Sequence, residues 1–160
     1  MNRRHLVRAA ASGVGLLPSG GLAPPFALAQ TVRTGSPEYI GAMTVMWRSV
    51  RSARQDISRL LSEPNREDEE WRIDVLAPFA VVVAVRDTTR TIVPPPKYVS
   101  AHARWLAALD TLVTAGTYLR AGILTDNEDT IQLARRSLTR AEDLLIQVEV
   151  LLPRRVLRPA

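Results

Sequence analysis

The stretch that decides the fold is residues 94–123, PPPKYVSAHARWLAALDTLVTAGTYLRAGI, because its apolar and small residues recur at alternating steps of four and three. This spacing places them on one face of an α-helix. The face consists of Tyr98, His102, Trp105, Leu109, Leu112, Gly116, Leu119 and Ile123. A helix with such a face is stable only when other elements cover it, so the rest of the chain should supply partners.

Three further segments have the same periodicity. Residues 36–62 open with Ser36-Pro37-Glu38, a combination typical of a capped helix start. Residues 67–92 open with four acidic side chains, which favour the positive end of a helix dipole, and residues 125–152 open with a Thr-Asp-Asn cap. Their predicted core faces are Tyr39, Met43, Met46, Val50, Ala53, Ile57 and Leu60; Trp71, Val75, Pro78, Val82, Val85, Thr89 and Ile92; and Ile131, Ala134, Leu138, Ala141, Leu145, Val148 and Leu152.

The segment 67–92 also contains features that disfavour a helix. Pro78 removes a backbone donor, and the run from Val81 to Val85 would suit a β-strand. No second strand candidate exists to pair with it, so a lone strand would leave its backbone groups without partners. We therefore predict a helix here, with a bend near Ala77.

These elements predict an all-α fold, an up-down-up-down four-helix bundle. Laying Pro37 on Pro96 aligns segment 37–43 with segment 96–102, and the same shift aligns the acidic starts 67–70 and 126–129. One interpretation is that the bundle consists of two fused αα-hairpins related by a pseudo-twofold axis. The other is that all helix starts favour Pro and acidic residues.

The N-terminal segment 1–29 has the features of a signal peptide: a basic start, an apolar Gly-rich middle and the small-x-small sequence Ala27-Leu28-Ala29. The opening, Asn2-Arg3-Arg4-His5-Leu6-Val7-Arg8, resembles a twin-arginine export motif, although Asn2 replaces its usual Ser or Thr and Leu6 its usual Phe. Export by the general secretory route is therefore the alternative. We expect cleavage after Ala29 and a periplasmic or secreted product. The apolar run is too short and too interrupted to serve as a membrane anchor.

Charge and cysteine content exclude several functions. The formal charge of +5 comes from the two ends, because residues 33–149 carry 15 basic and 16 acidic side chains. A nucleic-acid partner is therefore not expected. The absence of cysteine excludes disulfides, thiol catalysis and cysteine-ligated cofactors. We divide the chain into a signal peptide (1–29), a bundle (30–152) and a basic flexible tail (153–160).

One histidine, His102, remains after signal removal, and it lies on a predicted core face. Such an imidazole is usually a structural core residue paired by a hydrogen bond. The alternative is a cofactor site, because the alignment of Pro37 with Pro96 makes Met43 the counterpart of His102. That pair resembles the His/Met haem ligation of four-helix b-type cytochromes, which would imply haem as the cofactor.

Two clusters of charge are further candidate sites. The acidic starts of the second and fourth helices should share one end of the bundle, where capping explains them without a metal. The opposite end should carry a basic surface that suits an anionic partner from the cell envelope. The residues of this basic surface are Arg86, Arg90, Lys97, Arg154 and Arg155.

No catalytic motif accompanies the single mature histidine, so we do not expect an enzyme. The sequence favours an exported, non-enzymatic bundle that acts as an interaction or ligand-binding module in the cell envelope. Its partner would be a protein or an anionic envelope component. The competing hypothesis is a haem-binding or other cofactor-binding bundle that uses Met43 and His102.

Overall fold

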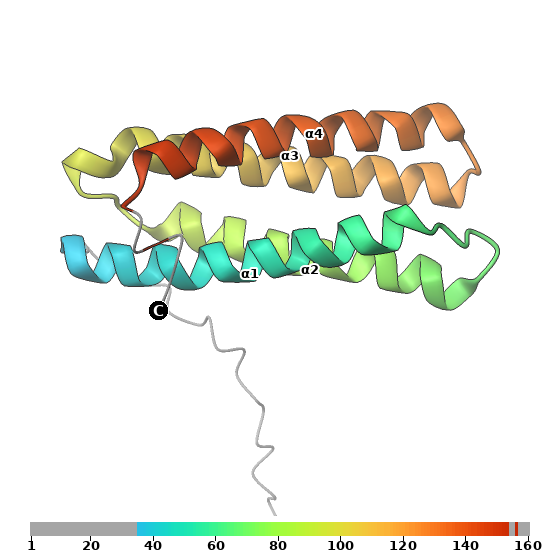
Figure 1. Cartoon of the computed structure of the whole chain (residues 1–160), viewed down its shortest axis with the longest axis horizontal. Helices are drawn as coiled ribbons and strands as arrows, with labels where there is room; N and C mark the ends of the chain where they lie inside the picture. The colour runs from blue at the N-terminus through green and yellow to red at the C-terminus, as the bar shows by residue number, and fades with distance from the viewer. Residues whose placement is uncertain (1–34, 154–155, 157–160) are drawn as a thin grey trace, which may run out of the picture.

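A computed structural model describes residues 35–153 and Val156, and this part of the chain is all-helical. Its elements are α1 (Ser36–Ser62), α2 (Glu69–Thr91), the 3₁₀ turn η1 (Pro96–Tyr98), α3 (Val99–Leu124) and α4 (Glu128–Leu151). Figure 1 shows two antiparallel hairpins stacked in two layers, α1 with α2 and α3 with α4. The predicted four-helix bundle is confirmed. The expected signal peptide lies outside the described residues.

The helix starts follow the capping chemistry of the sequence, with one correction. The side chain of Asp68 accepts from the backbone N–H of Glu70, and that of Asn127 accepts from Thr130 at 3.0 Å. Ser36 was predicted to cap α1, but it is the first helical residue and Gly35 occupies the cap position without a side-chain hydrogen bond. The helix begins one residue early because Pro37 is compatible with the first turn.

Helix α2 continues through Pro78 as one element. The core face predicted for this segment is correct except near the proline, where Phe79 is buried and Pro78 is only half-buried. Ile92 lies one residue beyond the helix end. Phe79 thus takes the core position that the spacing assigned to Pro78.

Aromatic side chains connect the two layers at one end of the bundle. The rings of Tyr39 and Tyr98 stack with their centroids 5.2 Å apart. The rings of Trp47 and Trp105 lie 5.5 Å apart between α1 and α3. Trp47, Trp105 and Trp71 are all buried, with at most 8% of the residue exposed, as the core faces predicted.

Helices α3 and α4 form the most extensive helix pair of the described chain. Small buried residues recur every seven positions on α3, and Ala134 and Ala141 face them with the same spacing on α4. A Cβ at Gly122 would lie 2.6 Å from Ile131 Cγ1 and 3.0 Å from the Ile131 backbone nitrogen. The absence of a side chain at this position therefore permits the close approach of the two helices. The small residues on α3 are Ala101, Ala108, Ala115 and Gly122.

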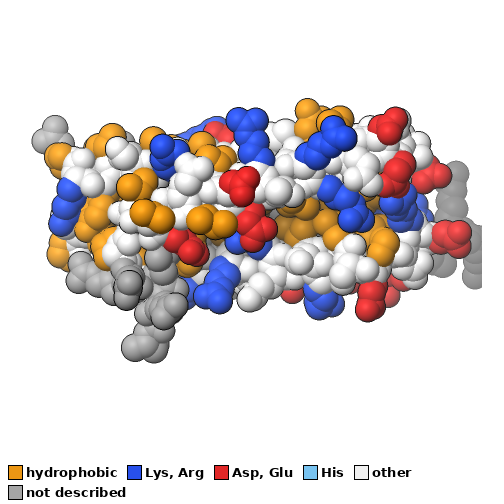
Figure 2. Space-filling view, turned by 45° about the horizontal axis from the view of Figure 1, so that its top comes forward, with side chains coloured by type: hydrophobic (Ala, Val, Ile, Leu, Met, Phe, Trp, Pro, Cys, Tyr) orange, Lys and Arg blue, Asp and Glu red, His pale blue; other side chains and the backbone are white. Residues whose placement is uncertain are grey.

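At the end of the bundle opposite the stacked tyrosines, an ion pair joins the α1–α2 connection to the start of α4. Arg66, in the α1–α2 connection, lies 2.6 Å from the carboxylate of Glu128 at the start of α4. The hydrogen bond from Arg66 holds the pKa of Glu128 below its usual range. Figure 2 shows acidic side chains gathered at this end, where α2 and α4 begin. The predicted shared position of the two acidic helix starts is thus confirmed.

The alignment that lays Pro37 on Pro96 preserves the core register. Met46 corresponds to Trp105, and Val50 corresponds to Leu109, and all four side chains are buried. Glu69 and Glu128, the first residues of α2 and α4, also correspond. This agreement extends the pattern beyond the helix starts and is what two related αα-hairpins would show.

One residue of the segment expected to be a flexible tail belongs to the core. Val156 is fully buried, and its backbone N–H donates to the Pro153 carbonyl at 2.9 Å. It packs in the same cluster as Leu152 and Tyr98. An apolar side chain just beyond the helix end thus covers the tyrosine end of the core.

Candidate functional site

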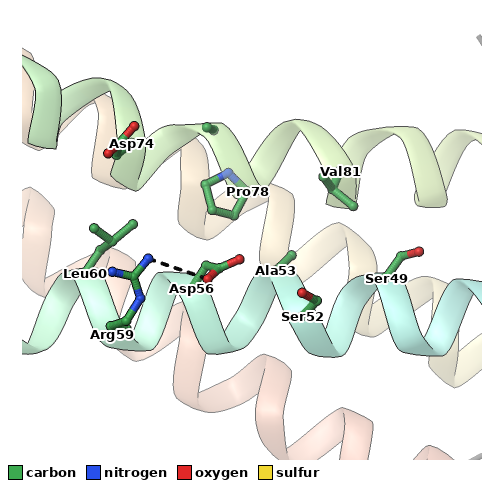
Figure 3. A pocket seen from close by; sticks show the side chains of 10 residues that line it. Ser49, Ser52, Ala53, Asp56, Arg59, Leu60, Asp74, Pro78 and Val81 are labelled. Carbon is green, nitrogen blue, oxygen red and sulfur yellow. Dashed lines mark ion pairs between the residues drawn. The ribbon is translucent and has the colours of Figure 1, made fainter.

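A groove of about 630 Å³ runs along the outer seam between α1 and α2 (Figure 3). Helix α1 provides six of the lining residues and α2 provides four, among them Pro78. The groove combines an apolar floor with polar and charged rims. Its lining residues are Ser49, Ser52, Ala53, Asp56, Arg59, Leu60, Asp74, Ala77, Pro78 and Val81.

The groove exists because both helices present small side chains along the same seam. On α1, Ser49, Ser52, Ala53 and Asp56 follow the helical spacing of one face. Ser49 donates to the Val45 carbonyl of its own helix at 3.2 Å, so its hydroxyl folds back and leaves the seam open. On α2 the opposite wall is built around Pro78.

Two carboxylates enter the groove from opposite helices. Figure 3 shows Asp56 projecting from α1 toward α2, and Asp74 beside the ribbon of α2 at the edge of the groove. The single cation of the lining, Arg59, lies 3.6 Å from Asp56, and its side chain is 71% exposed. An exposed pair at this distance is weak. With two carboxylates and one guanidinium, the lining carries a net negative charge.

The lining offers binding groups but no recognisable catalytic set. It contains two hydroxyls, two carboxylates and a guanidinium, and it contains no histidine. His102 lies in the opposite layer, at the start of α3. Nucleophilic catalysis by serine needs a base in hydrogen-bond reach, and neither Ser49 nor Ser52 makes such a contact with a side chain in the described chain.

The structure places His102 in the core, as predicted, and gives it a partner. Its Nδ1 and the hydroxyl of Tyr39 share a buried hydrogen bond of 3.3 Å, whose donor depends on the imidazole tautomer. Burial lowers the pKa of His102 below its ordinary value. Burial, with a smaller contribution from nearby Tyr98, raises the pKa of Tyr39 to about 12.

Met43 is also fully buried, in the core cluster that surrounds this hydrogen-bonded pair. If His102 bound a haem iron, Nε2 would be the free nitrogen, because Nδ1 is already paired with Tyr39. Haem ligation by Met43 and His102 stays a prediction.

The three described residues of the basic surface all interact with neighbouring side chains, and two of them are paired with carboxylates. Arg86 lies 2.8 Å from Asp87, and Arg90 lies 2.8 Å from Asp110 on α3. Lys97 lies over the ring of Tyr98, with its Nζ 4.9 Å from the ring centroid. Arg154 and Arg155, the other two residues predicted for this surface, lie outside the described residues.

Metal-binding clusters and membrane-spanning helices are both absent from the described chain. Between residues 35 and 153 and at Val156, no group of three or more His, Asp or Glu side chains is arranged to hold a metal ion. None of the helices in this part is sufficiently long and apolar to cross a membrane.

Sequence reasoning missed the groove, although its signal is present. It concentrated on the predicted buried faces, which include Ala53 and Pro78, whereas most of the groove is formed by residues beside those faces, at positions 49, 52 and 56 and again at 74, 77 and 81. Small residues at this spacing on two neighbouring helices indicate a seam that side chains do not fill.

The fold and the groove together define a class: an all-α four-helix bundle with an open, negatively charged groove on one hairpin. The chain matches no model of a known protein family, and no curated protein or solved structure is detectably similar to it. The function must therefore be argued from the site itself.

Proposed function

We propose that this protein is an exported, non-enzymatic binding module of the cell envelope, and that its binding element is the groove between α1 and α2. The observation that carries the proposal is the groove, whose volume of about 630 Å³ lies within the usual range for small-molecule pockets. Five of its ten lining residues are apolar and five are polar or charged, and small-molecule pockets combine apolar walls with placed polar groups.

We prefer the groove to the basic surface as the binding element. Arg86 and Arg90 are already paired with carboxylates, so an anionic partner would have to compete with Asp87 and Asp110. Asp74 in the groove has no cation among the ten lining residues other than Arg59. A protein partner or an anionic envelope component at the basic surface remains the less favoured version of the proposal.

A groove-filling variant tests the proposal. Ser52 is an exposed residue of the rim, so Ser52→Trp should fill the seam without disturbing the core. Amide NMR spectra should be recorded with 1-octanol, octylammonium and octanoate as probes. We expect at least one probe to shift the signals of the lining residues in the wild type but not in Ser52→Trp. Wild-type spectra that remain unchanged with all three probes would refute the groove as a binding element.

The export component is tested separately, because it depends on residues 1–29. Arg3→Lys combined with Arg4→Lys should retain the protein in the cytoplasm if the twin-arginine route carries it. Fractionation of cells that express the full chain, with the wild type as a control, measures this directly. Unchanged export of the double variant would argue for the general secretory route, and a wild type that stays inside would refute export.

The alternative function is haem binding by Met43 and His102, and it predicts a distinct signal. Our proposal predicts that the protein, purified and mixed with haemin, develops no Soret band that depends on His102. A Soret shift that His102→Gln abolishes and that Met43→Leu alters would favour the cofactor hypothesis instead.

A further inference from the structure

We propose that the groove selects amphiphilic organic cations, of which a primary alkylammonium is the simplest example. This inference rests on the proposed function, because it names the ligand class of the same groove. The ammonium group would lie between the two helices beside Asp56 and Asp74. The alkyl chain would lie along the apolar floor, over Ala53, Pro78 and Val81.

The charge of the lining residues predicts the sign of the charge on the ligand. Two carboxylates face one guanidinium, so an uncompensated negative charge remains when Arg59 pairs with Asp56. An anionic ligand would have to approach Arg59 while avoiding both carboxylates. A cationic ligand would be attracted by Asp74 and would pair with Asp56 once Arg59 moves aside.

The two carboxylates differ in burial and should therefore contribute to binding in different ways. Asp56 is half-buried at the groove wall, whereas Asp74 is exposed at the rim. Charge interactions strengthen as water is excluded, so Asp56 should contribute more once the ligand covers it. Asp74 should contribute mainly to attraction from solution, and its effect should weaken as salt is added.

The apolar lining residues predict that the ligand also carries an apolar chain. Val81 is 42% exposed on the groove side of α2, so the groove presents a branched apolar side chain to water. Leu60 is partly buried at the other end of the groove. An alkyl chain would cover Val81 and remove it from water, which a small hydrophilic cation would not do.

Arg59 acts as an internal competitor in this arrangement. It reaches the same carboxylate that the ligand would use, and its high exposure leaves it free to move away. Removing this cation should therefore strengthen binding of a cationic ligand and weaken binding of an anionic one. This opposite effect on the two ligand classes is specific to a charge-selective groove.

The test compares octylammonium with octanoate and 1-octanol, which share the chain and differ in charge. Affinities come from amide NMR titration of the full mature chain. We expect octylammonium to bind about twofold to fivefold more tightly than octanoate at low salt, a typical effect of partly exposed charges. Asp56→Asn should weaken octylammonium binding by about threefold to fivefold and Asp74→Asn by about twofold, and Arg59→Gln should strengthen it by about twofold to fivefold.

Matched controls separate the outcomes. Asp143→Asn removes an exposed carboxylate on α4, outside the groove, and should leave the affinity unchanged. Equal binding of all three probes in the groove would overturn the cation preference while the proposed binding function stands. Absence of every probe from the groove would overturn both. Octylammonium binding that Asp143→Asn weakens as much as Asp74→Asn would reduce the effect to general surface charge and overturn the inference.

Discussion

The indole Nε1 of Trp105 donates a hydrogen bond of 3.2 Å to the hydroxyl of Thr89, and both side chains are fully buried between α2 and α3. The same hydroxyl donates to the Val85 carbonyl at 2.7 Å and lies 3.3 Å from the sulfur of Met46. Thr89 thus accepts the hydrogen bond from the polar atom of Trp105, the largest fully buried side chain.

Replacing Thr89 by Val should therefore destabilise the protein despite conserving its shape. The change leaves the indole N–H of Trp105 buried without a partner, at a cost of about 1–3 kcal/mol. Thr88→Val is the matched control, because Thr88 bonds only to its own helix and is partly exposed. Urea unfolding of both variants measures the difference, and equal stabilities would show that water or another group replaces Thr89.

Truncation of Trp105 to Ala should be more severe. Its side chain has no solvent exposure and contacts Trp47 across the bundle, so removal leaves a large cavity. The expected loss is about 3–5 kcal/mol in the free energy of unfolding. Thermal unfolding followed by circular dichroism checks the prediction, and an unchanged midpoint would contradict the core assignment of α3.

The buried Tyr39–His102 pair should make the protein less stable at both acidic and alkaline pH. The pKa of His102 is lowered in the folded state, so protons bind the unfolded chain first as pH falls below about 6.5. The stability that neutral His102 contributes is therefore fully present above about pH 6.5 and is lost as the pH falls further.

Conversely, the pKa of Tyr39 is about 12 in the folded state and about 10 in the unfolded state, so stability should fall between those values. The acidic slope should diminish in His102→Gln, and the alkaline slope should diminish in Tyr39→Phe. Urea midpoints at pH 5, 7.5 and 11 measure both slopes. Slopes that neither substitution changes would assign the dependence to other groups.

Two glycines offer a test of the α3–α4 contact. A Cβ at Gly122 would clash with Ile131, partly with its backbone, so Gly122→Ala should destabilise by about 1–3 kcal/mol. Gly41 lies in the interior of α1 with no atom within 4 Å of its hypothetical Cβ. Gly41→Ala should therefore stabilise the protein by about 0.5–1 kcal/mol. Equal effects of the two variants would contradict the close approach of α3 and α4.

The turn between α3 and α4 contains a strained position that can be relieved. Asp126 has a φ of 46°, the left-handed region that glycine tolerates best. The following N–H, that of Asn127, donates to the Gly122 carbonyl at 2.9 Å and closes a Schellman-type cap. Asp126→Gly should stabilise by about 0.5–1 kcal/mol, whereas Asp126→Val should destabilise. Differential scanning calorimetry should show midpoints shifted in opposite directions.

The sequence was sufficient for the fold because each core face repeats one clear spacing. The face of α4 was predicted almost residue by residue, whereas the prediction for α3 omitted the small buried residues Ala101, Ala108, Ala115 and Gly122. The stacked pair of Tyr39 and Tyr98 agrees with the alignment of the two hairpins. Where the prediction was wrong in detail, at Ser36 and Pro78, the alternatives differ by one residue along a helix. Periodicity cannot resolve such a difference.

The site was harder to predict, because it depends on space that side chains leave empty. The hydrogen bond between His102 and Tyr39 joins residues 63 positions apart, and no local pattern indicates it. Likewise, the pairing of Arg90 with Asp110 depends on the relative rotation of α2 and α3. Helix rotation follows from the packing of whole faces, so individual polar contacts require the structure.

The unequal packing of the four helices has a consequence for the groove. Helix α1 approaches α2 closely, but its links to α3 and α4 depend on long side chains such as Trp47 and the ion pair of Arg54 with Glu142 at 2.5 Å. Elements with few close contacts open at the lowest free energy in native-state hydrogen exchange. One wall of the groove therefore belongs to a helix that packs on α3 and α4 through side chains and with few close backbone contacts, and a bound molecule would slow amide exchange in α1 more than in α3.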